Sequence, residues 1–173
     1  ELTELPNRRA FMRRLEDEVG RTKRYGFRLV LVMLDLDNFK TINDRFGHAG
    51  GDAVLRTYAN DILTVFRQHD MVARYGGEEF AILFRNTDVI EARVHLDVLR
   101  EKIASTPFIV NRGSRRKSDN KAAGKNKKAV SVTISIGAAD AHASKAASPW
   151  DVLKLADRAL YRAKKKGRNC VCV

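Results

Sequence analysis

The spacing of apolar residues changes along the chain between helical and extended, and these changes predict the order of the elements. In residues from about 7 to 23, Phe11, Leu15 and Val19 recur every four positions, which predicts a helix. The run "RLVLVMLDLD", from about Arg28, is almost continuously apolar and ends in acids, which is typical of a buried central strand. The stretch "FKTINDRFG" predicts a short helical turn that Gly47 closes.

The rest of the pattern predicts two helices, a hairpin, a late strand and a final helix. One helix follows Gly47 in "GDAVLRTYANDILTVF", and the hairpin strands occupy roughly residues 71–75 and 79–84. Apolar residues three and four apart predict a helix over residues 89–103. Residues 130–136 alternate apolar side chains with Ser or Thr, which predicts a strand with one buried face. Ser148 and Pro149 predict the start of the last helix, with Asp151 completing a capping box, and Gly167 predicts its end.

This order of elements predicts an α+β fold with a ferredoxin-like, palm-type βαββαβ core, a mainly antiparallel central sheet and extra helices at both ends. The chain has 173 residues, and we expect residues 1–173 to form a single domain. In this topology the first strand lies beside the third and antiparallel to it. The end of the first strand, "DLD", and the hairpin tip, "GGEE", are therefore expected at one edge of the sheet.

Carboxylates and glycines gather at that expected edge. They are Asp35, Asp37, Glu78 and Glu79, with Gly76 and Gly77. An all-oxygen set without His or a reactive Cys suits Mg²⁺ or Mn²⁺, and such an ion usually serves a phosphate substrate. The two glycines would let phosphate oxygens approach main-chain N–H groups. A tight turn with a solvated edge explains "GGEE" taken alone, whereas both clusters together favour phosphoryl or nucleotidyl transfer.

Further residues fit a nucleoside triphosphate. Lys40, Lys164 and Arg168 could neutralise its β- and γ-phosphates, although cations near a helix end also complement the helix dipole. An ionised Asp52, with Asn43, could accept hydrogen bonds from the N1–H and N2–H₂ edge of guanine. Both residue types also favour helix starts, so N-caps are the alternative interpretation of this pair.

Charge is concentrated in one stretch of the chain. The formal net charge is +12, and residues 111–128 hold eight basic residues and one acidic residue. This stretch is rich in Gly, Ser, Asn and Lys, which favours a flexible insertion over a nucleic-acid patch, since no aromatic residue interleaves its charges. No apolar run is long enough to span a bilayer, so we expect a cytoplasmic domain, with any membrane anchor in a region N-terminal to this sequence.

Five segments in this order resemble the GGDEF-domain diguanylate cyclases: "LTELPNRRAF", "LDLDNFKTINDRFGHAGGD", "ARYGGEEFAI", "VTISIGAA" and "ADRALYRAKKKGRN". The resemblance covers nearly the whole chain. It implies a palm-like cyclase that condenses two GTP into cyclic di-GMP and pyrophosphate, as a homodimer with one GTP per subunit. It also implies a catalytic output domain whose N-terminal sensory or regulatory domain is not in this sequence.

The resemblance assigns roles to individual residues. Asp35, the main-chain carbonyl of Leu36 and Glu78 would hold Mg²⁺ or Mn²⁺, and Glu79 would assist Glu78, which is a candidate to deprotonate the attacking 3′-OH. The remaining GTP ligands it implies are Asn43 and Asp52 at guanine, Phe39 and Leu55 at the base pocket, Gly76 and Gly77 at the hairpin tip, and Lys40, Lys164 and Arg168 at the phosphates.

An inhibitory product site is implied as well. The family carries an R-x-x-D five residues before its glycine pair, and "RQHD", Arg67 to Asp70, stands in that register. Arg67 could fork onto guanine O6 and N7 while Asp70 accepts from N1–H and N2–H₂. A helix-end ion pair is the alternative for this motif.

Two other classes of function compete with a product-inhibited cyclase. One is a degenerate, non-catalytic sensor of GTP or cyclic di-GMP, against which the intact "GGEEF", Asp35, Lys40 and Asn43 argue. The other is a nucleic-acid-binding module driven by the +12 charge.

Overall fold

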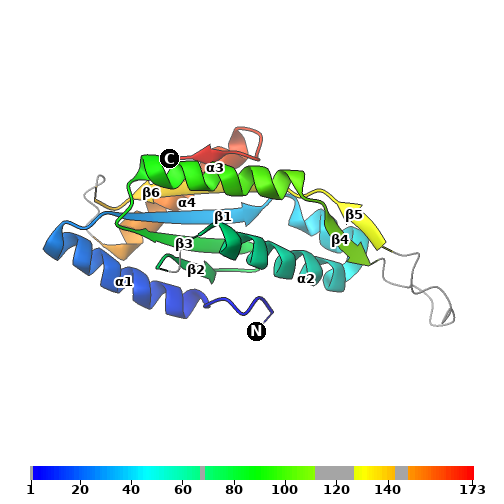
Figure 1. Cartoon of the computed structure of the whole chain (residues 1–173), viewed down its shortest axis with the longest axis horizontal. Helices are drawn as coiled ribbons and strands as arrows, with labels where there is room; N and C mark the ends of the chain where they lie inside the picture. The colour runs from blue at the N-terminus through cyan, green and yellow to red at the C-terminus, as the bar shows by residue number, and fades with distance from the viewer. Residues whose placement is uncertain (1, 67–68, 112–126, 143–147) are drawn as a thin grey trace.

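The computed structural model describes residues 2–66, 69–111, 127–142 and 148–173 (Figure 1). Along the chain the elements are α1 (Arg8–Tyr25), β1 (Leu29–Leu36), α2 (Phe39–Val65), β2 (Met71–Arg74), β3 (Glu79–Arg85), α3 (Val89–Ser105), β4 (Phe108–Asn111), β5 (Lys127–Val130), β6 (Ile134–Asp140), α4 (Pro149–Lys165) and β7 (Val171–Cys172). The expected α+β, βαββαβ fold with helices at both ends is confirmed. Among the described residues, no helix is both long and apolar enough to cross a membrane.

Side-chain caps begin three of the helices. The Asn7 carboxamide accepts the N–H of Ala10, the Asp88 carboxylate accepts the N–H groups of Ile90 and Glu91, and the Ser148 hydroxyl accepts the N–H of Asp151. Each cap satisfies backbone donors that the first helical turn leaves without partners. The predicted starts of the first and last helices are therefore confirmed.

The main sheet is built around β1. Within the described residues its strand order is β2–β3–β1–β6–β7, and β1 pairs antiparallel with both β3 and β6. Only the edge pairing of β6 with β7 is parallel among these strands. Every residue of β1 is buried, as its continuous apolar run predicts.

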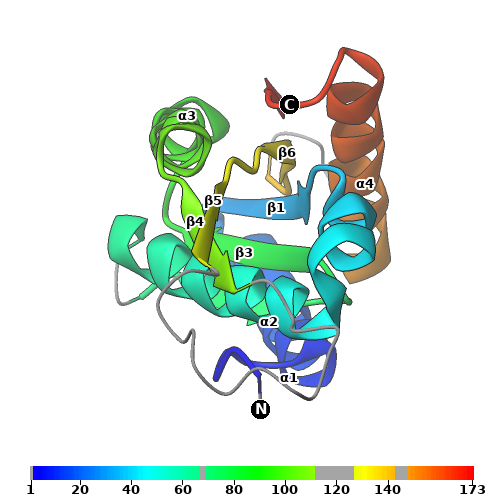
Figure 2. The same cartoon turned by 90° about the vertical axis from the view of Figure 1, so that its right-hand side faces the viewer.

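The two faces of the sheet carry separate apolar cores. Val30, Val32 and Leu34 face the core that α2 and α3 cover, whereas Leu31 and Met33 face the core that α1 and α4 cover. Figure 2 shows α3 and α4 on opposite sides of the sheet. The alternation of side chains along β1 thus supplies both cores from one strand.

The predicted strand over residues 130–136 is wrong in its extent. Val130 ends β5, which pairs with β4 in a separate two-stranded sheet that projects at one end of the molecule in Figure 1, and β6 begins only at Ile134. Its polar positions also differ in exposure, because Ser131 is exposed, Thr133 is partly buried and Ser135 is fully buried. The alternation of residue types does predict extended chain. It does not reveal that the Thr133 and Ser135 hydroxyl groups have a buried hydrogen-bond partner, Asp37.

The basic insertion is only partly described. Residues 112–126 lie outside the described residues, so the expectation of a flexible insertion over 111–128 is not tested there. Its margins differ from the expectation, because Asn111 ends β4 and Lys127 and Lys128 belong to β5. The two strands pair antiparallel, with Asn111 opposite Lys127.

Helix α4 lies unusually close to β6 at Gly137. A Cβ added there would overlap the backbone of α4 at Leu160 N and Ala156 O. Contact at this point is therefore between main chains, and only glycine leaves room for it. The approach fixes the height of α4 above the sheet, and α4 carries Lys164 toward the end of β1.

We expect Gly137→Ala to destabilise the fold by about 1–3 kcal/mol, since the added methyl must displace backbone rather than a flexible side chain. The matched control is Gly20→Ala in α1, where an added Cβ meets nothing within 4 Å. That control should change stability by less than ~1 kcal/mol, in the stabilising direction. Urea unfolding followed by circular dichroism measures both; equal stability of the two variants would contradict the close approach.

Candidate active site

The end of β1 and the hairpin tip meet as the topology predicts. Asp35 lies opposite Glu79 in the β1–β3 register, and Leu36 N donates a hydrogen bond to the Glu78 carbonyl oxygen at 3.4 Å. The hairpin tip is fixed by its own strand, because the Arg74 guanidinium donates to the Gly77 carbonyl oxygen at 2.7 and 3.1 Å. The two acidic segments therefore adjoin at one sheet edge.

Lys164 reaches this edge from α4. Its Nζ lies 2.8 Å from Asp35 Oδ2, and the Asp35 carboxyl is mostly buried. Burial raises the pKa of Asp35, while the hydrogen bond and charge of Lys164 oppose that rise and the neighbouring Asp37 charge adds to it. Arg168 is near enough for its charge to lower the same pKa. Two of the predicted phosphate ligands thus share a site with a predicted metal ligand.

Glu79 is crowded by other acids. Burial raises its pKa, and the negative charges of Asp35, Asp157 and Glu78 raise it further, against the opposing effect of Lys164. Its carboxylate lies over Gly76, where an added Cβ would be 2.6 Å from Glu79 Oε2. Gly77 is exposed at the tip. The crowding of carboxylates makes the edge a place where an added positive charge would be stabilised.

Asp37 belongs to a different network. Its carboxylate accepts hydrogen bonds from Ser135 Oγ at 2.6 Å, Thr133 Oγ1 at 2.7 Å and Asn169 N at 3.1 Å. Three donors thus engage Asp37, which is the member of the predicted carboxylate group whose oxygens the protein itself supplies with hydrogen bonds. Asp37 instead ties β1 to β6 and to the segment that carries Arg168. The signal that sequence reasoning missed was the pair of hydroxyls in "VTISIG", read as solvent-facing.

A break in α2 brings Asn43 and Asp52 toward each other. In an uninterrupted helix, nine residues make about two and a half turns, which would put the two side chains on opposite faces. Gly47 interrupts the helix with φ 72° and ψ 172°, a conformation that residues with a Cβ rarely adopt. Beyond the break, Asn43 Oδ1 lies directly against Gly51, the neighbour of Asp52. Both residues lie several positions inside helical segments, so the N-cap interpretation is wrong for this pair.

The surroundings of this pair are apolar on one side. Phe39 and Leu55, the residues expected at a base pocket, are both buried in the core that α2 and α3 share. The ring of Phe39 also approaches Gly51, with Cζ 3.0 Å from where a Cβ would stand. Asn43 and Asp52 are partly exposed. The arrangement offers polar groups at the surface above a buried aromatic floor.

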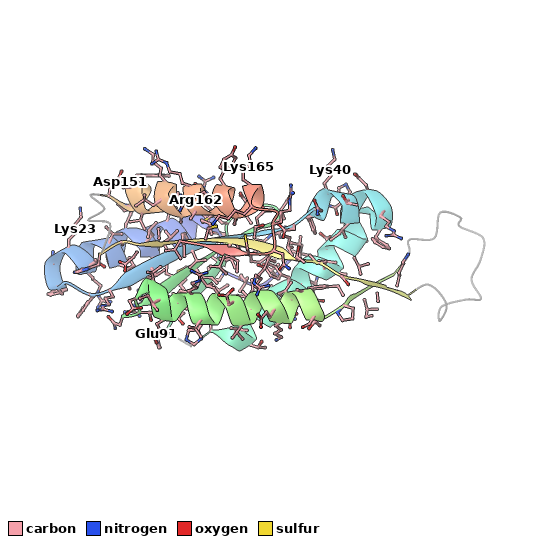
Figure 3. All side chains as sticks on the ribbon, turned by 90° about the horizontal axis from the view of Figure 1, so that it is seen from above. Lys23, Lys40, Glu91, Asp151, Arg162 and Lys165 are labelled. Carbon is pink, nitrogen blue, oxygen red and sulfur yellow. The ribbon has the colours of Figure 1, made fainter. Side chains whose placement is uncertain are left out.

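Lys40 and Arg168 are the exposed cations of the predicted set. Figure 3 shows Lys40 extending away from the ribbon at the start of α2. Arg168 lies just beyond α4 with φ 67°, and its N–H closes the helix end on the carbonyl oxygen of Ala163. The main chain of Arg168 is therefore fixed, while its side chain is exposed.

The donors at the edge suit a hard divalent cation. Among the described residues no group of three or more His, Cys, Asp and Glu side chains is placed to hold a metal ion. Asp35 and Glu78, together with the Leu36 carbonyl, instead resemble the sparse oxygen set of an ion that is completed by water and substrate phosphates. Burial is the main cause of the raised pKa values of Asp35 and Glu79, and neighbouring acids add to both rises against the opposing charge of Lys164.

The predicted product site is only half described. Arg67 lies outside the described residues. Asp70 immediately precedes β2, its side chain is only 2% exposed, and His69 Nε2 lies 3.9 Å from its Oδ1. Nothing in the described residues tests whether Arg67 and Asp70 bind a nucleotide or pair with each other.

The chain is similar in sequence to known diguanylate cyclases. The family model "Diguanylate cyclase, GGDEF domain" matches residues 1–170. Over 168 residues the chain is 41% identical to the diguanylate cyclase DgcP of Pseudomonas aeruginosa, covering 97% of this chain and 22% of DgcP. The chain thus spans about a fifth of the length of that relative.

Solved structures resemble the whole chain. The GGDEF domain of DgcB from Caulobacter crescentus, in complex with c-di-GMP, has a TM-score of 0.84 at 34% identity, covering 99% of this chain and 92% of that one. The active GGEEF domain of a diguanylate cyclase from Vibrio cholerae has a TM-score of 0.82 at 32% identity, covering 98% and 97%.

We expect Asp37→Ala to destabilise the protein by about 3 kcal/mol, because buried hydroxyl and amide donors lose a charged acceptor. The amide of Asn169 should exchange with solvent much faster at the same time. Asp17→Ala, an exposed change on α1, is the control and should alter stability by less than ~0.5 kcal/mol. Urea unfolding and amide hydrogen exchange give the two readouts; unchanged protection of Asn169 would show that Asp37 does not hold this segment.

Proposed function

Because the chain belongs to the GGDEF family of diguanylate cyclases, we propose that it condenses two molecules of GTP into cyclic di-GMP and releases two of pyrophosphate. The observation that carries the proposal is the meeting of Asp35, the "GGEE" hairpin and Lys164 at one sheet edge. Carboxylates beside a cation and a side-chain-free turn are what a triphosphate and its counter-ion require.

Guanine recognition rests with Asn43 and Asp52. Gly47 brings the two toward the same place, and an Asp carboxylate matches the two donors that guanine presents on its N1 and N2 edge. Adenine presents an acceptor at N1, which leaves such a carboxylate without a donor. Phe39 and Leu55 form the apolar floor below them.

The phosphate end of GTP would lie toward the cations. Lys164 and Arg168 already concentrate positive charge near Asp35, and Lys40 adds an exposed ammonium from the start of α2. Gly77 leaves room for phosphate oxygens at the hairpin tip, whereas the Glu79 carboxylate lies over Gly76. We propose that Asp35, the Leu36 carbonyl and Glu78 hold Mg²⁺ or Mn²⁺, which when bound would neutralise phosphate charge and polarise the α-phosphate.

In each half of the reaction the 3′-oxygen of one GTP forms a bond to the α-phosphorus of the other, and the bond to pyrophosphate breaks. The hydroxyl proton must be removed as this bond forms. Glu78 accepts it in our proposal, and Glu79, whose pKa is raised by burial and by neighbouring acids, assists beside it. Repetition at the second 3′-hydroxyl closes the ring.

One chain presents one such site, so ring closure requires two subunits facing each other. A homodimer with one GTP per subunit supplies both reacting nucleotides, and each oxygen nucleophile then meets the phosphorus held by the partner. A regulatory segment elsewhere in a longer protein would control how often two such domains meet. Feedback inhibition by cyclic di-GMP at Arg67 and Asp70 would act on the same encounter without touching either GTP.

We expect purified protein with GTP and Mg²⁺ to form cyclic di-GMP, to form no cyclic product from ATP, and to lose turnover in Glu78→Gln. The substitution removes the carboxylate that we propose to bind the metal and to accept the 3′-hydroxyl proton. We expect turnover to fall by at least ~10³-fold. Glu101→Gln on the exposed face of α3 is the matched control and should be fully active. Separation of nucleotides by chromatography measures the product; near-normal synthesis by Glu78→Gln would exclude this assignment.

We expect Arg67→Ala to weaken inhibition by cyclic di-GMP at least about tenfold, because one bidentate contact to guanine is worth roughly 1–3 kcal/mol. Initial turnover of GTP should stay near that of the parent. Product-inhibition curves measured side by side give the answer. An unchanged inhibition constant would mean that "RQHD" is a helix-end ion pair only.

A further inference from the structure

Exposed aromatic side chains are confined to two elements of the described structure. They are Tyr25 (58% exposed), Phe27 (47%), Trp150 (51%) and Tyr161 (62%). Tyr25 and Phe27 lie at and just beyond the end of α1, with ring centroids 5.6 Å apart, and Trp150 and Tyr161 lie on α4. Burial of aromatic surface is the usual outcome of folding, so four solvated rings on neighbouring elements are unusual for a surface that contacts only water.

Cations accompany these rings. The exposed residues of α4 are Trp150, Lys154, Asp157, Arg158, Tyr161, Arg162 and Lys165, of which four are basic and one is acidic. Lys165 Nζ lies 5.5 Å from the centroid of the Tyr161 ring, and the Arg24 guanidinium lies 5.8 Å from that of Tyr25. The positive charge is therefore interleaved with the aromatic surface rather than separated from it.

Both elements lie on the same side of the molecule. Helices α1 and α4 cover one core together and contact each other. Figure 3 shows Lys23 and Lys165 extending from α1 and α4 toward the same side. The aromatic and basic residues of the last turn of α1, the following residues to Phe27 and the outer side of α4 are here called the α1–α4 face.

From this combination we infer that the α1–α4 face docks on an anionic phospholipid bilayer. Trp and Tyr are the side chains that prefer the boundary between headgroups and acyl chains, because their rings are apolar and their tips form hydrogen bonds. Lys and Arg beside them meet the negative headgroups and keep their apolar stems along the boundary. Helix α4 is strongly amphipathic and lies with its apolar side on the sheet, so its basic and aromatic side is free to lie parallel to a membrane plane.

A single-stranded nucleic acid is the competing occupant. Proteins that bind such strands use a charged groove that tracks the backbone, with aromatic rings spaced for successive bases. The rings here lie on α4 and at and just beyond the end of α1, and Trp150 and Tyr161 are eleven residues apart, about 16 Å along a helix. That spacing fits independent anchoring in a plane better than stacking of neighbouring bases.

The chain carries its own probe for this surface, since Trp150 is the only tryptophan in the sequence. Purified protein is mixed with vesicles of phosphatidylcholine and phosphatidylglycerol, or of phosphatidylcholine alone, and Trp150 emission and co-sedimentation are recorded. We expect a blue shift and co-sedimentation with the anionic vesicles only, both reversed by added salt. Quenching of Trp150 by brominated acyl chains should accompany binding.

Two arginines make a matched pair of variants. Arg158→Gln removes one cation from the α1–α4 face, whereas Arg93→Gln removes one exposed cation from α3 on the opposite side of the sheet. We expect Arg158→Gln to weaken vesicle binding about fivefold and Arg93→Gln less than about twofold. Circular dichroism and GTP turnover without vesicles verify that both variants are folded.

Several outcomes would overturn the inference. No binding to anionic vesicles, or equal binding to both vesicle types, would remove the lipid partner. Co-sedimentation without a change in Trp150 emission would assign binding to another basic part of the chain, such as residues 111–128. If vesicle binding weakened equally in both arginine variants, binding would depend on net charge and not on the α1–α4 face. Tighter binding of single-stranded oligonucleotides than of vesicles, with a Trp150 shift, would assign the face to nucleic acid.

Discussion

The pairing of β1 between β3 and β6 is the constraint on which the rest of the structure depends. Its antiparallel register puts Asp35 opposite both Glu79 and Ser135, so that one strand end is joined to the acidic hairpin and to the hydroxyl-bearing strand. A shift of one residue would turn every β1 side chain to the other face and would exchange the two cores. The apolar residues of β1 therefore fix the position of Asp35 within the strand and of the polar residues that follow it.

Two neighbouring aspartates on this strand end have different tasks because their surroundings differ. Asp37 has three hydrogen-bond donors and joins elements, whereas Asp35 has one lysine, a raised pKa and acidic neighbours. A buried carboxylate whose hydrogen bonds are all supplied by the protein serves the structure. A carboxylate with few donors, a raised pKa and acidic neighbours is a candidate binding site for a cation. The chemistry at this sheet edge thus depends on which aspartate receives few hydrogen bonds from the rest of the protein.

The sequence was sufficient for the order of the core elements and for the meeting of Asp35 with the "GGEE" hairpin, because apolar spacing and topology determine both, but it did not predict β4, β5 or β7. It did not reveal pairing between distant polar side chains: the alternation predicts a solvent face for Thr133 and Ser135, whereas both hydroxyl groups donate to Asp37. It also left Asn43 and Asp52 open as caps, since the break at Gly47 that brings them together depends on backbone dihedral angles. Local patterns encode burial well, but they do not encode pairing between distant polar groups.

The main-chain contact at Gly137 has a mechanical meaning. The layer of side chains between a helix and a sheet has low compressibility, although individual side chains still change rotamers. No such layer exists where α4 rests directly on β6. Helix α4 and strand β6 therefore move as one stiff unit at this point. A force on the outer surface of α4 would be transmitted directly to Lys164 near the end of the helix, and through it to Asp35.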